Sequence, residues 1–152
     1  MQMEQYREFM ESYVCFMEEM AQGESEKYSA MLSYDSKRID HAVSRQQAMN
    51  MRLGQLEEQR EQEQKQLGFE GMTFQQILAH LEPENREDFA SLFRRFEQAI
   101  NDVKYFNGKS ISFAQAGLQM LGKMGNNQAG TYGANGKRPD GGGGISLFEA
   151  KV

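Results

Sequence analysis

The sequence has little cysteine or proline and no tryptophan. Cys15 is the only cysteine, so the chain can form neither an intrachain disulfide nor a zinc site made of several cysteines, which is typical of proteins of the reducing cytosol. The only prolines are Pro83 and Pro139, and they leave long stretches in which nothing interrupts a helix. This composition, together with 11 methionines, is unlike that of a compact α/β enzyme.

Basic residues are fewer than acidic ones, and the apolar runs are short. Lys and Arg number 17 against 22 Asp and Glu, so the net charge of −5 argues against a dedicated nucleic-acid-binding protein. The longest early apolar run, residues 13–17, is far shorter than the roughly 20 residues that span a bilayer. The Met-Gln-Met-Glu start lacks the basic residues of a secretory signal. We therefore expect a cytoplasmic protein without membrane insertion.

Helical periodicity occupies the first 67 residues in two stretches. Apolar side chains recur at spacings of three and four over 4–34 and again over 37–67, where they fall near heptad core positions. The short polar side chains of Asp35 and Ser36 can cap a new helix, which predicts a turn between the stretches, with one continuous helix as the alternative. Residues 57–66 are all Glu, Gln, Arg or Lys, which predicts a solvated helix end that projects past its partner.

Two further helices are expected in the second half of the chain. Thr73 stands three residues before Gln76, the spacing of a capping box, and apolar residues then form one face of a short helix up to Leu81. Pro83 suits the first turn of the next helix. The stretch 84–123 has the pattern of one helix of about 40 residues, roughly 60 Å long. Its last third is apolar around a wider arc than one partner helix would cover.

These lengths predict an all-α fold. We expect an elongated antiparallel helical hairpin packed with a third long helix, coiled-coil-like, with a short connecting helix. The third helix is the longest, so its C-terminal part should overhang the hairpin. Eight of the 15 glycines lie between Gly125 and Gly144. We therefore expect a helical domain over 1–124 and a flexible Gly-rich tail over 125–152, which ends with the apolar residues Ile145, Leu147 and Phe148.

Catalytic and metal-binding patterns are scarce. The histidines, His41 and His80, belong to no Glu-x-x-His motif, because Arg38 and Ile77 occupy the positions that the glutamate would need. No glycine-rich phosphate loop follows a strand. We therefore expect no enzyme, no metal site and no cofactor.

Several side chains have both a structural and a functional interpretation. Cys15 is expected to be a small buried hydrophobe, with a redox thiol as the alternative. The carboxylate pairs Glu18-Glu19 and Glu57-Glu58 are expected to be solvated. The methionines of the tightest stripes, Met10, Met17 and Met49, are expected in the core. The methionines of the overhang, Met120 and Met124, suit the core and a partner contact equally well.

The order of these segments resembles the FlgN family of flagellar type III export chaperones, over most of the chain. The first two helices show a Lys, a turn and a Leu-Glu-x-x-Arg sequence, carried by Lys27, Leu32, Asp35, Ile39, Val43, Gln46-Gln47, Leu53, Leu56-Glu57 and Arg60. The short helix after Thr73-Phe74 and the Asn-bearing apolar helix from Asn101 to Leu121 follow in the same order. Residues 131–136 are similar to a Tyr-Gly-x-x-Gly tail. The high Met content and the Ile145–Phe148 ending depart from the family pattern.

The resemblance implies a binding function. Chaperones of this family hold the hook–filament junction proteins, FlgK and FlgL, prevent their premature assembly and deliver them to the flagellar export apparatus. The family's cargo surface lies on the C-terminal amphipathic helix, which corresponds to about 107–124 here. The expected contacts are Asn107, Ile111, Phe113, Ala114, Leu118, Leu121 and Met124.

A self-assembling coiled-coil structural or adaptor protein is the alternative, since the same apolar face could bind a second copy. The chaperone interpretation predicts a monomer or weak oligomer.

Overall fold

The computed structural model describes residues 2–124, and the tail predicted over 125–152 lies outside them. It contains four helices in the order α1 (Gln2–Ser33), α2 (Ser36–Gln66), α3 (Phe74–His80) and α4 (Pro83–Met124). There is no strand among the described residues, so the expected all-α class is confirmed. Within these residues, no helix is both long and apolar enough to cross a membrane.

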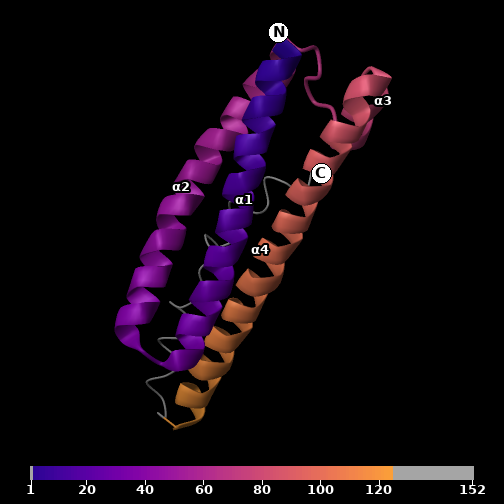
Figure 1. Ribbon diagram of the computed structural model, residues 1–152. Coiled ribbons are helices and arrows are strands. Elements are labelled where there is room, and N and C mark those ends of the chain that lie inside the picture. The colour runs from indigo at the N-terminus through magenta and orange to yellow at the C-terminus, as the bar shows by residue number, and fades with distance from the viewer. Residues whose placement is uncertain (1, 125–152) are drawn as a thin grey trace.

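The helices form an elongated bundle in which α1 is central (Figure 1). α1 and α2 are an antiparallel hairpin, and α4 lies along α1, while the backbones of α2 and α4 do not come close to each other. The short α3 packs on the first part of α4, at the end of the bundle that holds the N-terminus. The predicted hairpin with a third long helix and a short connecting helix is therefore confirmed.

Local signals in the sequence explain where the helices begin. Asp35 is the N-cap of α2, because its side chain accepts hydrogen bonds from the backbone N–H groups of Lys37 and Arg38 at 3.0 and 3.3 Å. Tyr34 before it has a φ of +57°, which reverses the chain at the hairpin turn. This confirms the turn and excludes a continuous helix.

The third and fourth helices also begin at the predicted residues. Thr73 and Gln76 form the capping box of α3, in which each side chain accepts from the other residue's backbone N–H, at 3.2 and 2.9 Å. Pro83 is the first residue of α4, where its missing N–H costs no hydrogen bond.

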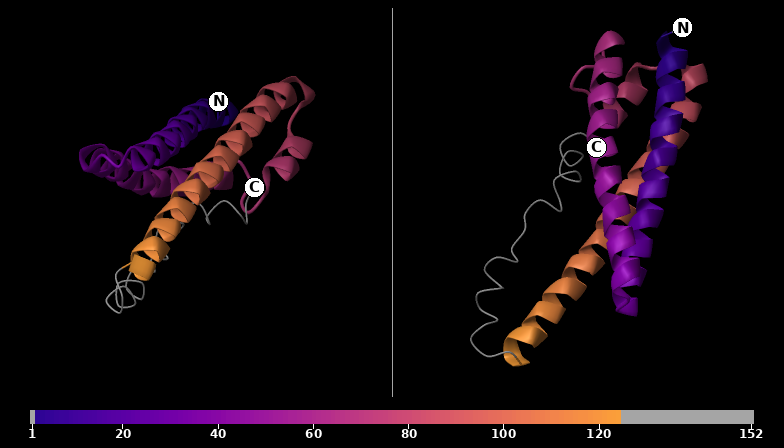
Figure 2. Two further views of the ribbon diagram at one scale, coloured as in Figure 1. Left: turned by 90° about the horizontal axis from the view of Figure 1, so that it is seen from below. Right: turned by 90° about the vertical axis from the view of Figure 1, so that its left-hand side faces the viewer.

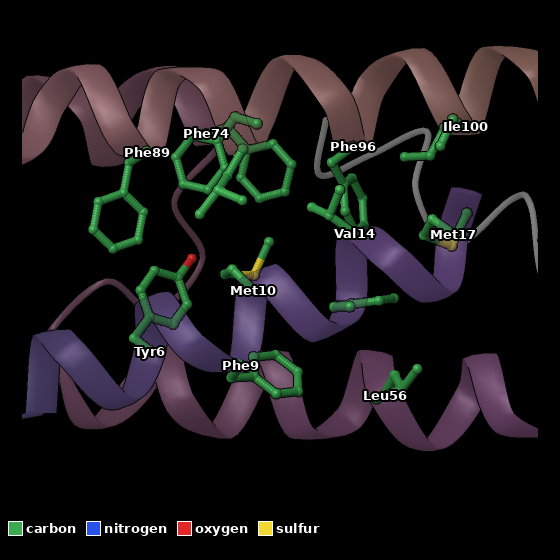
Figure 3. Close-up of a cluster of buried hydrophobic side chains, with 14 of the residues drawn as sticks. Tyr6, Phe9, Met10, Val14, Met17, Leu56, Phe74, Phe89, Phe96 and Ile100 are labelled. Carbon is green, nitrogen blue, oxygen red and sulfur yellow. The ribbon is translucent and has the colours of Figure 1, made fainter. Parts of the chain in front are cut away.

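The core between α1, α3 and α4 is aromatic. Tyr6 stacks on Phe89 with 5.6 Å between ring centroids, and Tyr13 meets Phe96 edge-on at 4.8 Å. Phe74 of α3 stacks on Phe93 of α4 at 4.2 Å. Figure 3 shows three side chains of α1 that point toward α3 and α4. Met10 faces Phe74, Val14 lies against Phe96, and Met17 faces Ile100. Met10 and Met17 are core residues as expected, whereas Met49 is only half-buried.

Three predictions about burial are wrong. Cys15 is exposed, because its neighbours one turn away, Glu11, Ser12, Glu18 and Glu19, place it on the polar side of α1. The stretch 57–66 does not project freely into solvent, since Glu57, Arg60 and Gln64 are buried against α1 and α3. Of the carboxylate pairs, Glu18-Glu19 and Glu58 are exposed as expected, whereas the prediction that Glu57 is solvated is wrong.

Candidate partner-binding site

The last turns of α4 extend beyond the hairpin formed by α1 and α2. The ring of Tyr34, in the hairpin turn, contacts the ring of Phe113 at 5.8 Å between centroids. From there α4 continues for the eleven residues 114–124, which is about 16 Å at 1.5 Å per residue. Figure 1 shows α4 running past the hairpin turn, and Figure 2 shows its end separated from the hairpin helices. The predicted overhang is present.

The inner face of α4 continues along this overhang without a cover. A helix completes five turns in about 18 residues, so Leu118 lies on the same side as Ile100, and Leu121 on the same side as Val103. Ile100 and Val103 are 3% and 2% exposed, whereas Leu118 and Leu121 are 43% and 62% exposed. One stripe therefore belongs to the core in its first part and faces solvent in its last part. We call its solvent-facing members, Ile111, Ala114, Leu118 and Leu121, the α4 stripe.

The other residues that were predicted to contact a partner, Phe113, Asn107 and Met124, do not belong to the α4 stripe. Phe113 is half-buried against Tyr34, at the boundary between bundle and overhang. Asn107 is half-buried, and its side-chain oxygen accepts a hydrogen bond from Lys27 at 3.3 Å. Met124 is the last helical residue, and its side chain lies outside the described part of the structure. Met120, for which two roles were open, is 63% exposed.

A buried polar cluster lies just before the overhang. Lys27 forms an ion pair of 2.9 Å with Glu24, which is 3% exposed. Gln46 of α2 donates through its Nε2 to that carboxylate and to the carbonyl of Met20. Since Lys27 also reaches Asn107, this cluster ties all three long helices together at the level where the stripe begins to be exposed. Helical periodicity does not single out Glu24 and Lys27, because their partners on α2 and α4 are distant in sequence.

A second buried polar cluster joins α1 to the end of α2. The carboxylate of Glu57 accepts from Tyr13 at 2.9 Å and from Arg60 Nε at 3.0 Å. Gln64 Oε1 accepts from Arg60 at 2.8 Å and from Tyr6 at 2.9 Å. Burial raises the pKa of both tyrosine hydroxyls, and the charge of Glu57 raises that of Tyr13 further. Burial opposes the charge of Arg60, but its hydrogen bonds to Glu57 and the attraction of the Glu57 charge together outweigh this and leave the pKa of Arg60 raised.

This second cluster has the properties of a structural element. Arg60 lies with its guanidinium 5.5 Å from the ring centroid of Phe74, so α3 covers the cluster from outside. The two tyrosines and Arg60 all have acceptors within the protein. These hydrogen bonds fix the register of α1 against α2.

The reactive side chains singled out in the sequence do not meet in one place. His41 and His80 are both exposed helix residues. The described residues contain no group of three or more His, Cys, Asp or Glu side chains placed to hold a metal ion. The α4 stripe is thus the candidate site.

Comparisons with known proteins give no match to this chain: no family model, no curated protein and no solved structure is significantly similar to it.

Proposed function

We propose that this chain is a flagellar type III secretion chaperone of the FlgN type, which binds the hook–filament junction proteins FlgK and FlgL before their export. The observation that carries the proposal is the α4 stripe, a core-type helix face that continues past the hairpin without a covering helix. A helical segment of the cargo would lie on this stripe in the place that α1 takes along the earlier turns. The order of the sequence motifs supports the choice of family.

The energetics suit reversible binding. Burying a Leu or Ile side chain contributes roughly 1.5–3 kcal/mol, and the stripe offers Ile111, Leu118 and Leu121. Part of that gain is offset by the ordering of the bound segment. Cargo held in this way keeps its own assembly face covered, and it is released when the export apparatus competes for it.

The test places two charges in the α4 stripe and leaves the length of the helix unchanged. We expect Leu118→Asp with Leu121→Asp to abolish co-purification of FlgK and FlgL, because two carboxylates would be buried against an apolar cargo face. Both positions are exposed in the free protein, so helicity measured by circular dichroism should be retained.

Ser112→Asp with Gln119→Asp is the matched control, since it adds the same charge at exposed positions on the side of α4 away from the stripe. Cargo binding that survives the leucine pair, or that is lost equally in the control pair, would contradict the site.

Self-assembly through the same stripe is the competing function. Light scattering coupled to size exclusion should give the monomer mass at high protein concentration. A stable oligomer that the leucine pair dissociates would favour the coiled-coil adaptor instead.

A further inference from the structure

The chain continues from the end of the α4 stripe into residues 125–152, which lie outside the described part of the structure. Met124 ends α4, and the middle of the stripe lies eight residues earlier, which is about 12 Å along the helix axis. The far end of the stripe, Ile111, lies about 20 Å from Met124. The rest of the chain is therefore attached close to the exposed apolar face.

The sequence after Met124 divides into a glycine-rich part and a short apolar part. The 20 residues 125–144 include eight glycines and no Leu, Ile, Val, Met or Phe. Ile145, Phe148 and Val152 then follow at spacings of three and four, the pattern of the anchors on one face of a helix that binds in a groove. We call residues 145–152 the apolar segment.

The length of the glycine-rich part matches the distance that the apolar segment must span. A glycine-rich chain of 20 residues has a root-mean-square end-to-end distance of about 25 Å, and the stripe lies about 12–20 Å from Met124. A tether is most effective when its root-mean-square length is close to the span, and short tethers give effective concentrations in the millimolar range. A segment with an intrinsic dissociation constant of only about 1 mM would therefore cover the stripe half of the time.

We propose that the apolar segment binds to the α4 stripe of its own chain and covers it until cargo displaces it. This inference rests on the proposed function and adds the regulation of the same site to it. The anchors of the segment lie against Leu118 and Leu121, in the place that a cargo helix takes when it binds. The cover keeps the apolar face of the free protein away from water, which limits aggregation. Only a partner that binds more tightly than the tethered segment gains access to the stripe.

A second copy of the chain suits the stripe less well. A stable interface between two proteins takes about 20–30 residues from each partner, whereas the stripe has four residues on about three turns of one helix. At the micromolar concentrations of a free protein, a face of this size binds a second copy far less often than a tethered segment at a millimolar effective concentration.

The cover is tested by methyl NMR on the full chain at two protein concentrations. Ile145→Asp with Phe148→Asp removes the anchor face of the segment together with the ring of its phenylalanine. We expect this double variant to shift the Ile and Leu methyl signals of the α4 stripe, because the covered state is lost. The methyl signals of Ala116 and Met120, on the opposite side of the same turns, should not move.

Ser146→Asp with Ala150→Asp is the matched control, since it adds the same charge to the segment away from its anchor face. Stripe signals that do not respond to the first pair, or that respond equally to both pairs, overturn the inference. A response that disappears on dilution also overturns it, because the segment would then come from a second copy.

Cargo binding separates this inference from the proposed function. FlgL should bind about two- to tenfold more tightly to the Ile145→Asp, Phe148→Asp protein than to the unmodified chain, because the open stripe no longer has to be uncovered. Equal affinity would overturn the regulation of the site. If the stripe signals respond but neither FlgK nor FlgL binds, the cover stands and the proposed function fails. If the Leu118→Asp, Leu121→Asp protein loses cargo but the stripe signals do not respond to the segment, the proposed function stands without the cover.

Discussion

At the scale of single residues, Gly23 shows how one side chain can depend on the absence of another. Gln46 of α2 lies against Gly23 of α1, and a Cβ added at Gly23 would overlap the side-chain oxygen of Gln46. Gln46 is 3% exposed and is held by its bonds to Met20 and Glu24, so it has little freedom to move away. The glycine therefore serves a close contact between helices at the cost of helix propensity.

We predict that Gly23→Ala destabilises the protein by about 1–3 kcal/mol, because the displaced Gln46 leaves buried polar groups without partners. The gain of Ala over Gly in helix propensity, about 1 kcal/mol, offsets only part of this cost. Urea denaturation of Gly23→Ala, Gln46→Ala and the double variant measures the coupling.

The double variant should be more stable than Gly23→Ala alone, since it removes the clash as well as the bond. Gly54→Ala is the control, because a Cβ there meets nothing within 4 Å. An additive cycle would contradict the proposed contact.

At the scale of elements, the starts of the helices are determined by local chemistry. Asp35, Thr73 and Pro83 act within one turn of the backbone that they cap, so the sequence alone was enough to place them. The overhang of α4 was predictable for a similar reason, since it follows from the relative lengths of the helices. The residues of the α4 stripe follow from the 3.6-residue period.

The polar stretch at the end of α2 could not be predicted in the same way. Glu57, Arg60 and Gln64 are buried only because Tyr6 and Tyr13 of α1 provide hydrogen bonds from 44 to 58 residues away. These three residues follow Leu53 and Leu56 at spacings of three and four, so they lie on the same buried face of α2. This spacing was the only signal in the sequence that they are buried. Residue type alone favours solvent for such side chains, so the partner must be known before burial can be assigned.

Asp35→Ala should cost about 1 kcal/mol, because the first amides of α2 lose their acceptor. Thermal denaturation followed by circular dichroism measures this loss. Asp40→Ala, an exposed position later in α2, is the control and should leave the midpoint nearly unchanged. Equal effects of the two substitutions would contradict the capping role.

At the scale of the whole molecule, the aromatic core and the two polar clusters divide the bundle into zones. The cluster around Arg60 lies near the N-terminal end of α1, and the cluster around Glu24 lies before the overhang. The stretch between them is apolar, with Met10, Val14 and Met17 of α1 against α4 (Figure 3). Apolar side chains alone would allow the helices to slide along one another. The specific hydrogen bonds of each cluster fix their register.

Global stability should fall in alkaline solution. Since the pKa values of Tyr6 and Tyr13 are raised in the folded protein, only the unfolded chain loses these protons as the pH passes about 10. Their contribution is complete below that pH and is lost as the pH rises toward the folded-state values. Denaturation at a series of pH values from about 9 to 11.5 should therefore give a falling free energy of unfolding.

Tyr13→Phe should flatten that fall, whereas Tyr105→Phe, at an exposed position, should not. The Tyr13 variant should also be less stable by about 1–2 kcal/mol at neutral pH, since Glu57 loses one donor. An unchanged alkaline slope in the Tyr13 variant would exclude the buried hydroxyl as its cause.

The central place of α1 has a consequence for local opening. The backbones of α2 and α4 each lie close to α1 and not to each other, so most of the contact that either outer helix loses when it detaches is contact with α1. α1 can be released only when both interfaces are lost, which amounts to unfolding the bundle. The backbone amides of α1 should therefore be the slowest to exchange with solvent, and the outer helices provide the partial openings through which the protein fluctuates.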